Sequence, residues 1–247
     1  SKLNDDRLGR ALDAIYPHLE EIWVEIVGRA LLRYDIDLSL VFYDLTAFYF
    51  EGAYRQNQAI ILGHSRAHRD KKQRKLALNV TGREKFPFLY RLLDGNVADV
   101  STVQENMQRL LAVLRERGWP VEQVLVVGDR AMLSAAIVRA YHRANLKYLG
   151  ALKVLGEKEQ TLIRGVSEQE LLAHPLDAEH YGVARTYTFE IAEEGWSVTE
   201  RALVVLSRTL RRQRRQRVRQ LRERQATLRL IAAERLNRRK YKRRAYV

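Results

Sequence analysis

The sequence predicts an α/β fold, a mixed β-sheet flanked by helices, and three patterns support this class. Apolar residues near the N-terminus recur with helical spacing. Two dense apolar runs in the first half of the chain are joined by a short turn, as in a β-hairpin. A strand, a helix and another strand then follow in order, which usually gives two parallel strands with a right-handed crossover.

Composition narrows the class of protein. The chain has 247 residues, enough to bury a core, and no cysteine, which excludes disulfide frameworks and thiolate zinc sites. No apolar run approaches the roughly 18 residues of a membrane span, and the N-terminus lacks a signal-peptide pattern. We therefore expect a cytoplasmic protein without a membrane partner.

The net charge of +14 is concentrated in one segment. Residues 208–244 hold 17 Lys and Arg against two acids, a net +15, whereas the rest holds 27 basic and 28 acidic residues, a net −1. Such a segment usually tracks a polyanion, although a solvated helix with acidic partners elsewhere is the alternative. We favour nucleic acid, because two acids screen little self-repulsion. The candidate contacts are Arg211, Arg212, Arg214 and Arg215.

Residues 5–33 are predicted to be helical, with Pro17 at the start of a second helix. The apolar stripe consists of Leu8, Leu12, Ile15, Leu19, Ile22, Trp23, Ile26 and Val27. We expect this stripe to pack into the core and to carry no chemistry.

Residues 38–52, LSLVFYDLTAFYFEG, are so rich in strand formers that they predict a strand covered on both faces. Asp44 is unexpected there, because an ionised carboxylate is costly to bury without a partner or a metal ion. Two interpretations stay open. Asp44 is either a structural aspartate bonded to nearby backbone or to Thr46, or a metal ligand of a phosphoryl-transfer site.

A basic stretch, GHSRAHRDKKQRK, follows at residues 63–75. His64, His68 and Asp70 have metal-ligand chemistry, but the glycine and the charges favour a loop or strand over the helix that this spacing needs. Solvation or a position near phosphate is the better interpretation. Residues 76–80 and 86–93 then predict a hairpin, and the apolar stripe from Val103 to Leu114 predicts a helix.

The second informative stretch is a strand at residues 124–127, a helix with a buried face from Leu133 to Tyr141, and a strand at residues 148–152. Asp129 lies just beyond the first strand, at the edge where open α/β sheets place ligands. The alternative is that Asp129 caps the following helix. Residues 183–192 and 197–207 predict two more strands, and the basic segment predicts a long helix.

The two aspartates are more informative together than apart. The predicted topology can bring the ends of their strands side by side. Two carboxylates there can hold divalent ions roughly 3.5 to 4 Å apart, which activate the attacking oxygen and stabilise the leaving oxygen of a phosphodiester. Mg²⁺ suits such all-oxygen ligation and needs few carboxylates. With a basic helix to bind the polyanion, the pair predicts metal-dependent phosphoryl transfer on nucleic acid.

Four sequence blocks carry a resemblance to a known family. They are YDLTAFYFEG at 43–52, GHSRAHRDKKQ at 63–73, FPFLYRLLDGNVADVST at 86–102 and VVGDRAM at 126–132. In order and spacing they resemble the bacterial DDE transposases of the insertion-sequence-four superfamily, which have an RNase H-like fold.

The resemblance implies Asp44 and Asp129 as catalytic residues and ligands of a two-metal site with Mg²⁺ or Mn²⁺. It implies hydrolysis and strand transfer at transposon ends, with DNA as partner, a homodimer in the DNA complex and a nucleoid-associated location. Arg66, Arg69, Lys72 and Arg130 are weaker candidates for phosphate contact. A non-catalytic nucleic-acid binder and another RNase H-like nuclease remain the alternatives.

The resemblance also implies domain boundaries, and the chain departs from the family pattern at one signature. It implies N-terminal helices over 1–37, the first part of an RNase H-like core over 38–153, a β-rich insertion over 154–207 and a basic helix over 208–247. The family's third acid lies in a signature Y-x2-R-x3-E-x6-K. Arg219 and Glu223 match it only in part, with Gln216 and Leu230 in place of Tyr and Lys, and Glu234 fails too. We therefore expect a fragment, or a truncated copy, that lacks the third catalytic acid.

Overall fold

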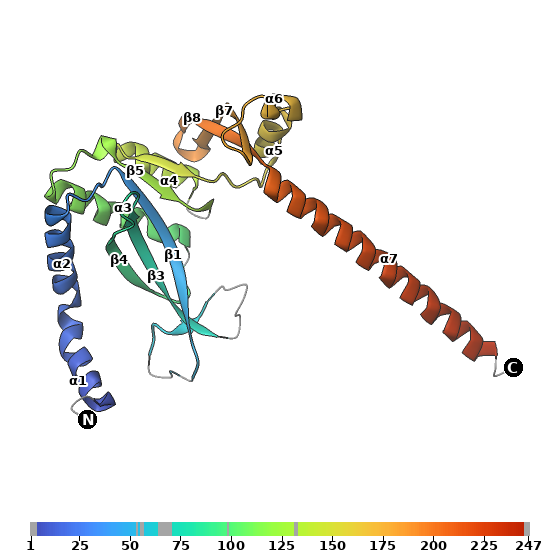
Figure 1. Cartoon of the computed structure of the whole chain (residues 1–247), viewed down its shortest axis with the longest axis horizontal. Helices are drawn as coiled ribbons and strands as arrows, with labels where there is room; N and C mark the ends of the chain where they lie inside the picture. The colour runs from blue at the N-terminus through green and yellow to red at the C-terminus, as the bar shows by residue number, and fades with distance from the viewer. Residues whose placement is uncertain are drawn as a thin grey trace. The chain divides into compact units, whose positions relative to one another are not determined.

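A computed structural model describes residues 4–52, 54, 57–63, 71–97, 99–130 and 133–244, without the side chains of residues 99–101 and 235–244. It divides into two compact units. The first comprises residues 1–153 and 190–196, and the second comprises residues 154–189 and 197–247. Each unit is described by itself (Figure 1).

The first unit contains the helices and strands of the predicted core. They are α1 (Asp5–Ile15), the 3-10 turn η1 (Tyr16–His18), α2 (Leu19–Arg33), β1 (Leu40–Phe50), β2 (Ile61–Leu62), β3 (Lys72–Thr81), β4 (Pro87–Asp94), α3 (Asp99–Glu116), the 3-10 turn η2 (Val121–Gln123), β5 (Leu125–Gly128), α4 (Ala135–Arg143) and β6 (Lys147–Gly150). The helical, hairpin and strand–helix–strand predictions are thereby confirmed.

The six strands form one mixed sheet. Its order is β2-β3-β1-β5-β6, and β4 also pairs with β3. β3 is antiparallel to β1 and β4, whereas β5 is parallel to β1 and β6 is parallel to β5. The crossover through α4 therefore joins two parallel strands, because a helix must carry the chain back to the starting edge. This mixed sheet is the one that an RNase H-like fold implies.

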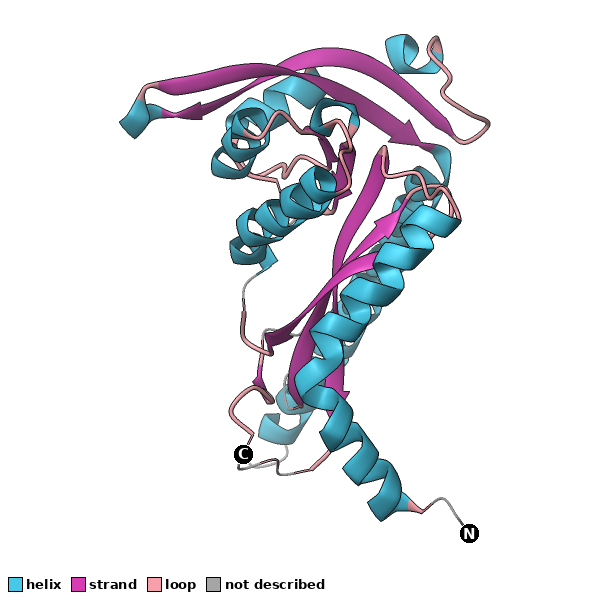
Figure 2. Cartoon of the chain, turned by 90° about the vertical axis from the view of Figure 1, so that its left-hand side faces the viewer, coloured by secondary structure: helices cyan, strands magenta, loops and turns pink. Residues whose placement is uncertain are grey.

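Helices α2, α3 and α4 pack on one face of the sheet (Figures 1 and 2). The core beneath them includes Val41, Tyr43 and Val126 from the sheet, together with Leu110 from α3 and Ile137 from α4. Val41 and Tyr43 are alternate residues of β1, so the odd-numbered side chains of this strand face the helices.

The other face of the sheet is partly exposed, which corrects one prediction. Side chains of β1 alternate, and Phe42 and Phe48 are 36% and 48% exposed. Leu92 of β4 and Leu149 of β6 are also exposed. The prediction of a strand covered on both faces is therefore wrong, since dense aromatic and β-branched residues fit a half-buried pleated surface equally well.

The N-terminal stripe also differs from its prediction. Trp23 and Val27 contact the core, but the other six residues of the stripe are exposed: Leu8, Leu12, Ile15, Leu19, Ile22 and Ile26. Helical periodicity identifies an apolar face, but it does not identify what covers that face.

The second unit contains α5 (Glu157–Arg164), α6 (Glu168–Leu172), most of β7 (His180–Ile191) and of β8 (Trp196–Ser207), and α7 (Arg208–Arg244). The tip of the β7–β8 hairpin, with the 3-10 turn η4 (Ala192–Glu194), is assigned to the first unit. β7 and β8 pair with each other in a two-stranded sheet, as predicted. Its small core joins Val166 and Leu171 to Tyr181 and Val183 of the hairpin. The two short helices were not predicted, because neither is long enough to show a sustained period.

No helix in the described part of the chain is both long and apolar enough to cross a membrane.

Candidate active site and nucleic-acid interface

Asp44 and Asp129 each directly follow the last pair of the parallel β1–β5 ladder. The β1–β5 ladder pairs Phe42 with Val127 and Tyr43 with Gly128, and each aspartate is the next residue in its chain. Neighbouring strands lie roughly 4.8 Å apart, and residues in register on parallel strands project to the same face. Continuing the register by one residue would place the two carboxylates side by side, just beyond the end of the ladder.

The Asp44 carboxylate is exposed on the half-open face of the sheet. Its Oδ1 accepts a hydrogen bond of 2.8 Å from the backbone N–H of Leu45. The bond to nearby backbone that the structural interpretation expects is therefore present. The burial that first made Asp44 unexpected is absent, and water solvates the carboxylate at little cost.

Asp129 is also exposed, one residue beyond β5. The N-cap of α4 is Ser134, whose hydroxyl accepts from the N–H of Ile137 at 3.4 Å. Asp129 is therefore not the N-cap of α4, and it lies at the end of a parallel strand.

Two polar contacts hold α3 against this part of the sheet. The Tyr43 hydroxyl and the Thr102 hydroxyl share a hydrogen bond of 2.8 Å. One helical turn further on, Asn106 exchanges reciprocal amide hydrogen bonds of 2.7 and 3.0 Å with Asn79. Asn79 is fully buried and lies opposite Tyr43 in the β1–β3 ladder. Sequence reasoning missed this cluster. Its only signal was Asn79, a polar residue among strand formers.

The described side chains supply only part of the ligand set of a divalent ion. Across the described ranges, no group of three or more His, Asp, Glu or Cys side chains is placed to hold a metal ion. The Asp44 and Asp129 carboxylates offer hard oxygen ligands, and Mg²⁺ binds through one or two carboxylates when waters and substrate phosphates complete its octahedron. The pair therefore fits an ion that is shared with a phosphodiester.

The structure describes only some of the other predicted contact residues of the core. Arg66 and Arg69 lie outside the described residues, as do His64, His68 and Asp70. Lys72 begins β3, and its Nζ donates to the backbone carbonyl of Tyr54 at 3.4 Å. Arg130 is exposed and directly follows Asp129.

The first turns of α7 are anchored to the second unit by ion pairs. Arg211 binds Glu168 of α6, with Nη2 at 2.9 Å from Oε2, and Arg212 binds Glu179 with Nη2 at 2.9 Å from Oε2. Thr209 donates a further hydrogen bond of 2.8 Å to Glu179. The bond from Arg211 lowers the pKa of Glu168, and the bonds from Thr209 and Arg212 lower the pKa of Glu179. Two of the four arginines predicted to contact nucleic acid thus have carboxylate partners.

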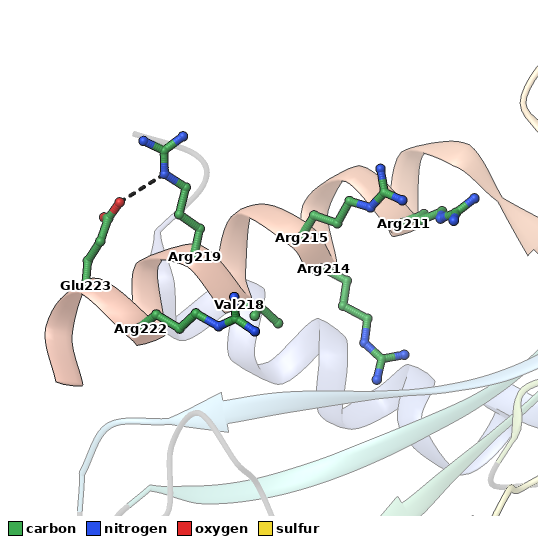
Figure 3. Close-up of a pocket in the computed structure, with 7 residues that line it drawn as sticks. All are labelled: Arg211, Arg214, Arg215, Val218, Arg219, Arg222 and Glu223. Atoms are coloured by element: carbon green, nitrogen blue, oxygen red, sulfur yellow. Dashed lines mark hydrogen bonds and ion pairs between the residues drawn. The ribbon is translucent and has the colours of Figure 1, made fainter. Parts of the chain in front are cut away.

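Beyond Arg212, every described side chain of α7 is exposed. A hollow along this helix is lined by Arg211, Arg214, Arg215, Val218, Arg219, Arg222 and Glu223. Figure 3 shows guanidinium groups projecting from successive turns, with Arg219 bound to Glu223 at 3.0 Å. Because all of these residues belong to one helix, the hollow is an open basic surface.

A mixed sheet of this strand order with flanking helices belongs to the class of RNase H-like α/β folds. A comparison of the sequence with known families is more specific. The family described as "Transposase DDE domain" matches residues 37–246, and the chain belongs to this family. The DDE transposase part of the sequence resemblance is thereby confirmed.

Solved structures give weaker similarities. The "Mos1 transposase paired-end complex with left transposon end" is 18% identical, with a TM-score of 0.34, over 60% of this chain and 43% of that one. The "piggyBac transposase synaptic complex with hairpin DNA" is 11% identical, with a TM-score of 0.37, over 79% of this chain and 40% of that one. This chain thus matches less than half of each protein. Curated proteins give no match.

Proposed function

We propose that this domain belongs to a DNA transposase, in which Asp44 and Asp129 are the catalytic carboxylates. The reaction is metal-dependent phosphodiester hydrolysis and strand transfer at transposon ends. The observation that carries the proposal is the parallel β1–β5 register, whose last pair, Tyr43 with Gly128, immediately precedes the two aspartates. Membership of the DDE transposase family supports it.

The proposed roles of the side chains follow from their positions. Asp44 and Asp129 would hold Mg²⁺ or Mn²⁺ on the exposed face of the sheet, and the metal would supply polarisation of the attacked phosphodiester. Arg130, next to Asp129, is placed to contact a phosphate of the same strand. The Leu45 N–H fixes one oxygen of Asp44 and limits the orientations of that carboxylate.

The basic surface of α7 supplies affinity for the DNA backbone, with Arg214 and Arg215 as its contacts. Arg211 and Arg212 instead hold the helix to its own unit through Glu168 and Glu179. The narrower assignment that we propose is a bacterial, nucleoid-associated enzyme of the insertion-sequence-four superfamily that binds DNA as a homodimer. Neither Glu223 nor Glu234 satisfies the signature of a third acid, so we expect weak cleavage from this chain.

The test is to change each proposed ligand to its amide. Asp44→Asn and Asp129→Asn remove a negative ligand while keeping the shape, so Mn²⁺ affinity should fall at least about tenfold for each variant. Mn²⁺-dependent nicking of supercoiled plasmid should be lost. Paramagnetic resonance of Mn²⁺ measures the first quantity, and gel electrophoresis measures the second.

Asp94→Asn is the matched control. Asp94 is also an exposed aspartate of the sheet, but it pairs with Arg74 of β3, far from Asp44 along the strands. This variant should bind Mn²⁺ and nick plasmid like the unchanged chain. Retention of both activities in the Asp44→Asn and Asp129→Asn proteins would instead favour a non-catalytic DNA binder that uses α7 alone.

A further inference from the structure

Lys85 stands in the turn between β3 and β4, and its backbone conformation is unusual for a lysine. Its φ is 59°, in the left-handed region, where glycine, asparagine and aspartate are the common residues. Other residues close the turn: the Thr81 N–H donates to the Phe86 carbonyl at 2.9 Å, and the Phe86 N–H donates to the Thr81 hydroxyl at 3.1 Å. The turn therefore does not require a lysine at this position.

The Lys85 side chain is held above the exposed face of the sheet, the face that carries Asp44. Its Nζ lies 4.8 Å from the centre of the Phe42 ring and donates a hydrogen bond of 2.6 Å to the Gly82 carbonyl. Phe42 is 36% exposed on that face. The ring attracts the ammonium, so the two contacts orient a long and otherwise flexible side chain. An ammonium has three N–H donors, and Gly82 occupies one of them.

Phe42 places this ammonium next to the proposed catalytic carboxylates. It precedes Asp44 by two residues of β1, a distance of roughly 7 Å along a strand. It pairs with Val127 of β5, which precedes Asp129 by two residues. The ammonium therefore lies one alternate residue pair before the two aspartates, on the same face of the sheet.

The charge of Lys85 is not neutralised by the protein. The neighbouring carboxylate, Glu84, accepts from the Thr81 hydroxyl at 3.2 Å and lies 3.9 Å from Arg83. Among the described residues, no carboxylate forms an ion pair with the Lys85 ammonium. A lysine in this state, with donors to spare, is suited to a phosphate oxygen.

We propose that Lys85 binds the DNA phosphate next to the one attacked at Asp44 and Asp129. The inference rests on the proposed function, because it adds a substrate contact to the same site. Phosphate contacts fix the register of a bound strand without reading its bases. Lys85 therefore determines which phosphodiester of the strand lies at the two carboxylates. Sequence reasoning did not single out this lysine, since most lysines in turns are solvated.

The first test locates the DNA backbone without any cleavage. The chain has no cysteine, so Lys85→Cys introduces a single thiol. That thiol should form a disulfide with a short duplex that carries an activated disulfide tether on one phosphate. Leu32→Cys, at a residue of α2 that is 75% exposed, is the control and should not cross-link. Equal cross-linking of the two proteins would overturn the proposal.

The second test separates the phosphate contact from the metal ligands. Lys85→Gln should slow Mn²⁺-dependent nicking at least about tenfold at low DNA concentration, the effect of losing one charge-assisted hydrogen bond. Its affinity for Mn²⁺ should stay unchanged, because both carboxylates remain. On an end-labelled duplex, the positions of the nicks should spread, since the register is no longer fixed. Lys85→Arg should restore most of the rate, because a guanidinium also binds phosphate.

Arg83→Gln is the matched control, because it removes the same charge from an exposed position of the same turn. It should nick like the unchanged chain, with the same nick positions. Equal slowing by Arg83→Gln and Lys85→Gln would overturn the proposal. So would a Lys85→Gln protein that unfolds at a lower temperature but nicks and positions its nicks normally. If the unchanged chain neither binds Mn²⁺ nor nicks, the proposed function fails, and the cross-link alone then decides whether Lys85 contacts DNA.

Discussion

At the scale of single residues, Tyr43 and Asp44 have different roles on the two faces of β1. Tyr43 is 2% exposed and contacts α3, whereas Asp44 is exposed on the opposite face. This division follows from the period of two in a strand. The buried contact beneath the proposed site therefore affects stability, while the carboxylate above it is available for chemistry.

Tyr43→Phe should destabilise the first unit by about 1 to 2 kcal/mol, because it leaves the buried Thr102 hydroxyl without its 2.8 Å partner. Urea unfolding followed by fluorescence measures the loss. Tyr34→Phe, a change of the same kind at a residue that is 70% exposed, should stay within about 0.5 kcal/mol of the unchanged chain. Equal losses in the two variants would show that the Tyr43–Thr102 bond contributes nothing specific.

The sequence predicted a site at Asp44 and Asp129, but the burial that supported the prediction at Asp44 is not observed. The strand pattern around Asp44 suggested burial on both faces, and burial made a metal ligand one of two interpretations. In the structure Asp44 is exposed, and what relates it to Asp129 is the parallel register of β1 and β5. Register depends on pairing between residues more than 80 positions apart, which local periodicity cannot show.

At the scale of elements, the first turns of α7 are held by contacts within the second unit. Arg211 and Arg212 bind Glu168 and Glu179, and Arg208 lies over the Tyr181 ring at 4.7 Å from its centre. Later turns of the helix carry arginines at i and i+4, such as Arg215 and Arg219, which repel each other. The anchor at the first turn is therefore the part of α7 that depends on protein contacts.

Acid should loosen this anchor. The pKa values of Glu168 and Glu179 are lowered below 4.5 in the folded state by their arginine and threonine partners. When the pKa of a carboxyl group is lower in the folded than in the unfolded protein, its ionised form stabilises the fold. That stabilisation is fully present above the unfolded-state pKa and is lost as the pH falls through the folded-state pKa. Below pH 4.5, the protection of residues 208–216 against hydrogen exchange, relative to the intrinsic rate at each pH, should therefore fall.

Glu168→Gln with Glu179→Gln should give the same fast exchange already at neutral pH, with little further change on acidification. Glu193→Gln, in the exposed turn between β7 and β8, should leave the exchange of residues 208–216 unchanged. An acid response that survives the double substitution would assign the effect to other carboxylates.

The elements that the sequence predicted are those with a long period or a clear turn, such as α3, the β3–β4 hairpin and α7. α5 and α6 were not predicted. The burial of the α1–α2 stripe was also misjudged, because apolar spacing does not show what covers a helix face.

At the scale of the whole molecule, charge is separated along the chain. Residues 208–244 carry a net +15 and the remaining residues a net −1. Each phosphate contact releases counterions, so the logarithm of DNA affinity falls with the logarithm of salt concentration by about 0.9 per contact on duplex DNA. The slope of this salt dependence therefore reports how many basic residues contact the DNA backbone, and it depends little on the DNA sequence.

Arg214→Gln, Arg215→Gln and Arg222→Gln, combined in one chain, should flatten this slope by roughly 2.7 and weaken duplex binding uniformly across sequences. All three arginines line the basic surface of α7. Arg10→Gln, Arg33→Gln and Arg143→Gln remove the same charge from exposed positions of the first unit, and this control should keep the original slope. Fluorescence anisotropy with a labelled duplex at several salt concentrations gives both slopes. If the two triple variants lose the same slope, binding depends on total charge and not on α7, and the proposed DNA-binding role of that helix is wrong.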